Sequence, residues 1–199
     1  MDVKKTGTTT LALLCKDGIV MGAESKATSG FMVANKEVKK LFQIDDKMAM
    51  TVAGDVSDVQ QLVRVLRAEI KLYKLETQEE MKVKAAATLL SNIMYGRKLF
   101  PYLAQIIVAG IDKLGKHIYS FDPAGACIEE KYVATGSGSV FVYGILEKDY
   151  KEGMKVKEGI ALAKQAIKVA KERDVFSGGE KIWLGIINDQ GVEIKEENL

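Results

Sequence analysis

The segment that decides the fold reads Thr6-Gly7-Thr8-Thr9-Thr10, and two strand-like stretches follow it directly. Residues 9–16 and 19–25 are rich in apolar side chains, and Lys16-Asp17-Gly18 joins them. Because an Asp-Gly pair is typical of a short turn between antiparallel strands, this spacing predicts a β-hairpin. The threonine run therefore stands at the start of the first strand.

The same run is typical of a nucleophile hidden behind a removable leader. If the peptide bond between Gly7 and Thr8 is cut, Thr8 carries both a hydroxyl nucleophile and a free amine that can act as its base. The reference pKa of an α-amine is about 7.7 to 8.0, against about 10.4 for a lysine side chain, so the amine suits that role near neutral pH. Before the cut the amine is part of an amide, and the protein would be inactive. The competing interpretation is that residues 8–10 only begin a strand, where threonine is favoured.

The rest of the chain alternates between strand and helix patterns. Further strands are predicted at residues 41–44, 47–53, 105–111, 118–121, near Tyr132, and at 181–188 and 192–194. Helices are predicted to open with two capping boxes, Ser57 with Gln60 and Thr77 with Glu80, then after residues 136–139 and over residues 156–172. This order predicts an α+β fold in which two antiparallel sheets lie between two helix pairs.

Composition limits the classes of function. The 199 residues are 47% hydrophobic and 28% charged, which suits one domain with a sizeable core. The net charge of +2 comes from interspersed charges, so we expect no nucleic-acid partner. No apolar run is long enough to span a membrane or resembles a signal peptide, and we expect neither membrane insertion nor secretion but a cytoplasmic protein.

The cysteines and the histidine form no recognisable ligand set. Cys15 and Cys127 are the only cysteines and lie far from each other in the sequence. We expect both to be buried and inert, and we expect no disulfide, metal site or cofactor. His117 stands in an alternating segment, which predicts an exposed strand position with a structural role.

Several segments together resemble the proteasome β-subunits of archaea over essentially the whole chain. They are Thr6 to Thr10, Lys39-Lys40-Leu41-Phe42-Gln43-Ile44, Val52-Ala53-Gly54, Ala85-Ala86-Ala87-Thr88-Leu89-Leu90-Ser91-Asn92, Thr135-Gly136-Ser137-Gly138-Ser139, Arg173-Asp174 and Ser177-Gly178-Gly179. Each alone is weak, since a Gly-Ser loop is usually flexible and a lysine pair usually solvated. Their common order and spacing are specific.

The resemblance implies an N-terminal nucleophile hydrolase, a four-layer αββα sandwich whose reactive threonine is exposed by autocatalytic removal of residues 1–7. The remaining residues, 8–199, would form a single catalytic domain. Thr8 takes the place of the nucleophile, and Lys40 matches the lysine beside it, whose ammonium would lower the pKa of the hydroxyl. Glu24 falls where the family carries Asp or Glu, more often Asp, and should pair with Lys40.

The resemblance also implies supporting residues and a pocket. Ser137, Asp174 and Ser177 match residues that orient the terminal amine and a water. The glycines beside Ser137 would allow close approach to the site, although a phosphate-binding loop ahead of a helix is a competing interpretation. Gly54 matches the position whose N–H faces the developing oxyanion. The positions that line the first specificity pocket correspond to Ala27, Val38, Val52 and Val56, which favours cleavage after hydrophobic residues.

By resemblance the chain is a threonine endopeptidase subunit that cleaves unfolded polypeptides inside a closed chamber, without a metal or cofactor. Its partners would be other β-subunits in heptameric rings, α-subunits in flanking rings, and an AAA ATPase acting through the α ring. Two alternatives stay open. One is a non-catalytic β-subunit that only builds the ring, and the other is the related subunit of a bacterial ATP-dependent peptidase, which the Lys39 to Ile44 and Ser177 to Gly179 segments disfavour.

Overall fold

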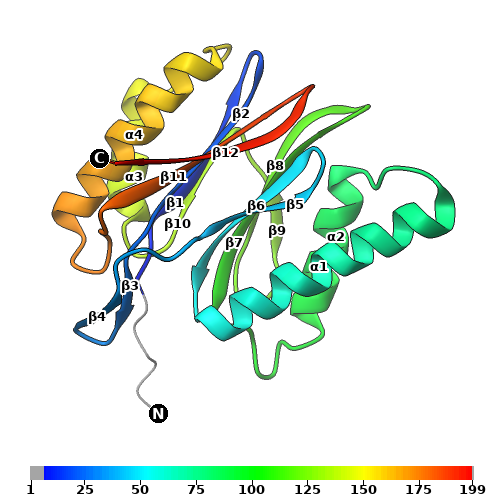
Figure 1. Ribbon diagram of the computed structural model, residues 1–199, viewed down its shortest axis with the longest axis horizontal. Coiled ribbons are helices and arrows are strands. Elements are labelled where there is room, and N and C mark those ends of the chain that lie inside the picture. Colours follow the sequence, from blue (N-terminus) through cyan, green and yellow to red (C-terminus); the bar gives the residue numbers. More distant parts are fainter. Residues whose placement is uncertain (1–6, 199) are drawn as a thin grey trace.

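Two five-stranded antiparallel sheets lie face to face at the centre of the computed structural model, which describes residues 7–198 (Figure 1). The first sheet has the strand order β10 (Tyr132–Thr135), β1 (Thr10–Cys15), β2 (Gly18–Glu24), β11 (Lys181–Asn188), β12 (Gly191–Asn198). The second has the order β5 (Leu41–Asp45), β6 (Met48–Gly54), β7 (Ala104–Asp112), β8 (Gly115–Phe121), β9 (Cys127–Glu129). A separate hairpin is formed by β3 (Ala27–Ser29) and β4 (Met32–Asn35).

A helix pair covers the outer face of each sheet, which makes four layers (Figure 1). The helices are α1 (Val56–Thr77) and α2 (Val83–Tyr95) on the second sheet, and α3 (Ser139–Asp149) and α4 (Val156–Arg173) on the first. The predicted αββα sandwich is therefore confirmed. The predicted first hairpin is also present, since Cys15 pairs with Gly18 across a two-residue turn.

The layers are held by three apolar clusters, one under each helix pair and one between the sheets. The helical stripes supply the outer clusters, with Leu66 of α1, Leu90 of α2 and Ile167 of α4 all fully buried. Each such side chain contributes about 1.5 to 3 kcal/mol on burial. Small residues such as Ala12, Ala49 and Ala109 occupy the inner cluster, where the two sheets approach each other.

Both predicted capping boxes were wrong. The N-cap of α1 is Asp55, whose carboxylate accepts a hydrogen bond from Ser57 N at 2.9 Å, so Ser57 lies inside the first turn. Thr77 ends α1 instead of opening α2. The second helix begins at Val83, whose N–H donates to Asp112 Oδ2 at 2.8 Å. That acceptor comes from the end of β7, 29 residues away, so no local pattern could reveal it.

Three short strands were not predicted. β3, β4 and β9 have three, four and three residues, and every residue of β4 and β9 is exposed. A strand without a buried face has no alternation of apolar and polar residues to recognise. The hairpin β3–β4 borders the candidate site through Ala27 and Thr28.

The prediction for the cysteines was half wrong. Cys15 is buried, and burial raises its pKa to about 11, but Cys127 is exposed because it lies on the edge strand β9. His117 on β8 is more enclosed than expected, with 18% of its side chain exposed, and its Nδ1 lies 2.7 Å from Glu129 Oε1 on β9. None of the helices described in residues 7–198 is long and apolar enough to cross a membrane.

Candidate functional site

Thr8 lies just before β1, where the first sheet faces the end of β6 and the start of α1. It is 5% exposed. Its hydroxyl donates a hydrogen bond to Gly7 O at 2.7 Å, and its N–H, which is still part of the Gly7–Thr8 peptide bond, donates to Ser137 Oγ at 3.3 Å. The hydroxyl and the N–H of the predicted nucleophile are thus both hydrogen-bonded. Residues 1–6, the rest of the expected leader, lie outside the described residues.

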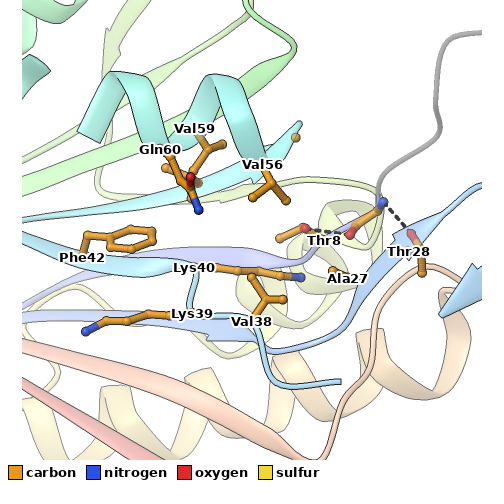
Figure 2. A pocket seen from close by; sticks show the side chains of 13 residues that line it. Thr8, Ala27, Thr28, Val38, Lys39, Lys40, Phe42, Val56, Val59 and Gln60 are labelled. Atoms are coloured by element: carbon orange, nitrogen blue, oxygen red, sulfur yellow. Dashed lines mark hydrogen bonds between the residues drawn. The ribbon is translucent and has the colours of Figure 1, made fainter. Parts of the chain in front are cut away.

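Lys40 and Glu24 form a buried ion pair beside Thr8. Lys40 precedes β5, Glu24 ends β2, and their side chains are 6% and 0% exposed. Figure 2 shows the Lys40 side chain extending along the pocket with its amine end toward Thr8. Burial lowers the pKa of the Lys40 ammonium, and the charge of Glu24 opposes that effect. The expected pairing of Glu24 with Lys40 is therefore present in the structure.

A buried charge pair is stable only if its remaining polar atoms are satisfied. Lys40 Nζ also donates to Lys26 O at 2.5 Å. The Glu24 carboxylate accepts backbone hydrogen bonds from Lys26 N at 2.7 Å, Gly178 N at 2.9 Å and Thr9 N at 3.3 Å. These donors come from three separate segments, which fixes the carboxylate and with it the ammonium.

A second polar cluster contacts Thr8 and Thr9. Asp174, at the C-terminal end of α4, accepts hydrogen bonds through Oδ2 from Ser137 Oγ and Ser177 Oγ, each at 2.6 Å. Ser137 in turn accepts from Thr8 N, and Ser177 Oγ lies 2.6 Å from Thr9 Oγ1. Ser137, Asp174 and Ser177 therefore converge on residues 8 and 9, although they are more than 120 positions away in the sequence.

Two glycines allow backbone segments at the site to lie close together. Gly136 has φ of 89°, and a Cβ there would lie 1.9 Å from Thr8 O. Gly54 has φ of 145°, and a Cβ there would lie 1.9 Å from Leu103 O on the neighbouring segment. The space in front of the loop around Ser137 is filled by residues 8 and 9, which disfavours the phosphate-binding interpretation of that loop.

A pocket lies next to Thr8, between the start of α1 and the segment that leads into β5 (Figure 2). It is lined by Gly7, Thr8, Ala27, Thr28, Val38, Lys39, Lys40, Phe42, Val52, Gly54, Val56, Val59 and Gln60. All four residues predicted for the specificity pocket are among them. Thr8, Lys40 and Gly54, which were predicted as the nucleophile, its neighbouring lysine and the oxyanion-binding position, therefore line the same pocket.

Sequence reasoning missed several lining residues. Val59 and Gln60 were not predicted to line a pocket, yet Val56, Val59 and Gln60 share one face at the start of α1 (Figure 2). The spacing of three and four residues could have revealed this face. Thr28 could not be recognised as a pocket residue, because no sequence pattern predicted the short strand that contains it.

The chemistry available next to Thr8 is that of hydroxyls, the Lys40 ammonium and the carboxylates of Glu24 and Asp174. In the part of the chain that the structure describes, no three His, Cys, Asp or Glu side chains are grouped so that they could hold a metal ion. A hydroxyl flanked by a lysine–carboxylate pair suits acyl transfer, in which the ammonium stabilises developing negative charge.

Comparison with known proteins identifies relatives along almost the whole chain. Residues 4–187 match the family described as Proteasome subunit. The chain is 50% identical over 199 residues to a protein named Proteasome subunit beta from Methanocaldococcus jannaschii, covering 99% of this chain and 88% of that protein. It is 45% identical over 200 residues to Proteasome subunit beta 1 from Thermococcus onnurineus, covering 100% of this chain and 98% of that protein.

Proposed function

The chain belongs to the proteasome subunit family as a β-subunit of the archaeal type with the N-terminal nucleophile hydrolase fold, and from this premise we propose that it is a catalytic threonine endopeptidase subunit. The observation that carries the proposal is that Thr8 lines the same pocket as Lys40 of the buried Lys40–Glu24 pair and is hydrogen-bonded to Ser137 of the Asp174 cluster. A subunit that served only as a scaffold would have no need to bury a charged pair at this point, which is costly unless it is fully hydrogen-bonded.

The proposed reaction has two acyl-transfer stages. Thr8 Oγ attacks the carbonyl carbon of a peptide bond, its proton passes through the free α-amine of Thr8 to the leaving nitrogen, and an ester forms. Water then hydrolyses the ester and restores the hydroxyl. Lys40, oriented by Glu24, stabilises the alkoxide character of Oγ, and the N–H of Gly54 faces the oxyanion. Ser137, Asp174 and Ser177 hold the amine and the hydrolytic water.

Residues 1–7 are proposed as a leader that the same hydroxyl removes, leaving residues 8–199 as the mature domain. In assembled particles we expect the mature chain to begin at Thr8. Intact mass spectrometry and N-terminal sequencing of the chain after co-assembly with its α-subunits would test this. A chain that keeps residues 1–7 in the assembled particle would instead indicate the non-catalytic ring-building subunit.

We propose that the chain assembles into heptameric rings between α-subunit rings in the cytoplasm, where an AAA ATPase delivers unfolded polypeptides. Large apolar side chains that protrude from the described surface support burial on assembly. Phe31 in the β3–β4 turn is 96% exposed, and Phe100 after α2 is 85% exposed. The names of the relatives agree with a role as one subunit of a larger particle.

The lining of the pocket predicts the cleavage preference. Ala27, Val38 and Val56 offer small or apolar walls, and Phe42 adds an aromatic one (Figure 2). Val52 also lines the pocket. A large apolar side chain of the substrate would gain about 1.5 to 3 kcal/mol on burial there, so we expect roughly tenfold or greater preference for Leu, Phe or Tyr over Ser at the cleaved position. Fluorogenic peptides that differ only at this position measure the ratio of kcat/KM values. A profile dominated by cleavage after acidic or basic residues would reject this assignment.

A further inference from the structure

We propose that the Thr28 hydroxyl is a positioning group for leader removal, because it accepts a hydrogen bond from the N–H of Gly7, the last leader residue. The inference rests on the proposed function and adds a residue to it. Thr28 belongs to the short strand β3, which no sequence pattern predicted.

The contact is a buried hydrogen bond. Gly7 N lies 3.2 Å from Thr28 Oγ1, and Thr28 is 7% exposed. Figure 2 shows this hydrogen bond, together with the one between Thr8 and the Gly7 carbonyl. The two bonds hold the N–H of Gly7 on one side and its C=O on the other.

The Cα of Gly7 is confined as well. A Cβ added to Gly7 would lie 1.8 Å from Phe176 Cβ and 2.8 Å from Ser137 Oγ, so no larger residue fits without displacing the chain. Phe176 and Ser137 lie in the segments that carry the Asp174 cluster. The leader residue is thus clamped between the β3–β4 hairpin and the loops around Asp174.

This clamp acts on the bond that must break. Thr8 Oγ lies 2.7 Å from Gly7 O, and the carbonyl carbon is about 1.23 Å from that oxygen, so the hydroxyl stands next to its electrophile. Glycine rotates more freely about φ and ψ than any other residue, and a hydrogen bond to its N–H removes part of that freedom. Thr28 therefore raises the fraction of chains in which Oγ faces the carbonyl carbon.

The step itself needs only water as a co-reactant. Thr8 Oγ bonds to the Gly7 carbonyl carbon, the bond from that carbon to Thr8 N breaks, and the hydroxyl proton ends on the nitrogen, which becomes the free amine. Water then cleaves the ester, leaving a carboxyl group on Gly7 and the hydroxyl on Thr8. Thr28 takes part in neither bond change and acts only through the position of Gly7.

A merely structural role for Thr28 makes a different prediction from a hydrogen-bonding role. Valine keeps the branch at Cβ, the volume and the strand preference of threonine but lacks the acceptor. Serine loses the methyl group but keeps the acceptor. If Thr28 only supported its strand or filled space, Thr28→Val would be processed better than Thr28→Ser. If the hydroxyl positions Gly7, the order is reversed.

The experiment follows the loss of residues 1–7 by intact mass over time, in full-length chains co-assembled with α-subunits. A buried N–H left without its acceptor costs enough to slow the step about tenfold in Thr28→Val, and Thr28→Ser should stay within about threefold of the wild type. Ser29→Ala serves as the matched control, since it removes an exposed hydroxyl from the next position of the same strand. Melting temperatures of the unassembled chains verify that every variant is folded.

The outcomes separate this inference from the function on which it rests. Wild-type rates in Thr28→Val, or equal slowing in Thr28→Val and Thr28→Ser, would overturn the role of the hydroxyl while leaving Thr8 as the nucleophile. Leader loss in a Thr8→Ala chain measured in parallel would instead overturn the proposed function itself. Slow processing of Thr28→Val with rescue by Thr28→Ser supports the positioning role.

Discussion

Thr8→Ala is expected to abolish both leader removal and peptidase activity, with a loss of at least roughly 10⁴-fold in kcat/KM for peptides. Alanine has no hydroxyl to attack a carbonyl, and the adjacent hydroxyl of Thr9 is already engaged with Ser177 at 2.6 Å. Intact mass of the assembled particle reports processing, and a fluorogenic peptide reports turnover. Thr8→Ser, which keeps an attacking oxygen, should retain measurable activity in both assays.

Thr88→Ala provides the matched control for this substitution. Thr88 is exposed on α2, and its hydroxyl only bonds to Lys84 O within the same helix, so its removal should leave processing and turnover unchanged. A Thr8→Ala chain that still begins at residue 8 in the particle would contradict the autocatalytic mechanism. Full peptidase activity in that variant would place the nucleophile elsewhere.

Lys40→Met is expected to cost about 10² to 10⁴-fold in kcat/KM and to destabilise the fold. The substitution removes the ammonium that faces Thr8 and leaves the buried Glu24 carboxylate without its charged partner. Breaking one side of a buried ion pair typically costs about 3 to 5 kcal/mol. Peptide turnover and chemical denaturation measure the two effects separately.

The double variant Lys40→Met/Glu24→Gln distinguishes catalysis from stability. Replacing both charges removes the unpaired carboxylate, so the free energy of unfolding should recover in large part while activity stays lost. Lys36→Met is the control, because Lys36 lies in the same segment but is solvent-exposed, with only a surface contact of 3.9 Å to Glu180. An active Lys40→Met enzyme, or recovery of activity in the double variant, would show that catalysis does not require the Lys40 ammonium.

Local sequence signals predicted the elements whose cause is local. The turn after Cys15, the strands predicted at residues 181–188 and 192–194, and the helix predicted over residues 156–172 all appear in the structure, because apolar periodicity and turn residues act over a few positions. The helix starts were wrong where a distant or overlooked side chain supplied the cap, as Asp112 does for α2. The edge strands β4 and β9 were not predicted, because neither has a buried face and so neither shows an alternation of apolar and polar residues.

The candidate site was predictable to a different extent. Thr8, Lys40 and Glu24 could be named from the family resemblance, and the structure brings them together with Ser137, Asp174 and Ser177. Thr28 and Phe42 could not be named as pocket residues, because no pattern in the chain indicates which of their side chains face a pocket built from four separate segments.

The amino-acid sequence by itself indicated the candidate nucleophile Thr8, the alternation of strands and helices, and the apolar faces that must be buried, since these depend on residue type and spacing along the chain. Only the tertiary structure decided which groups meet. Ser137 reaches Thr8 across 129 positions, and Thr28 reaches Gly7 across 21, because sheet register and layer packing set the distances between segments that the chain itself keeps apart.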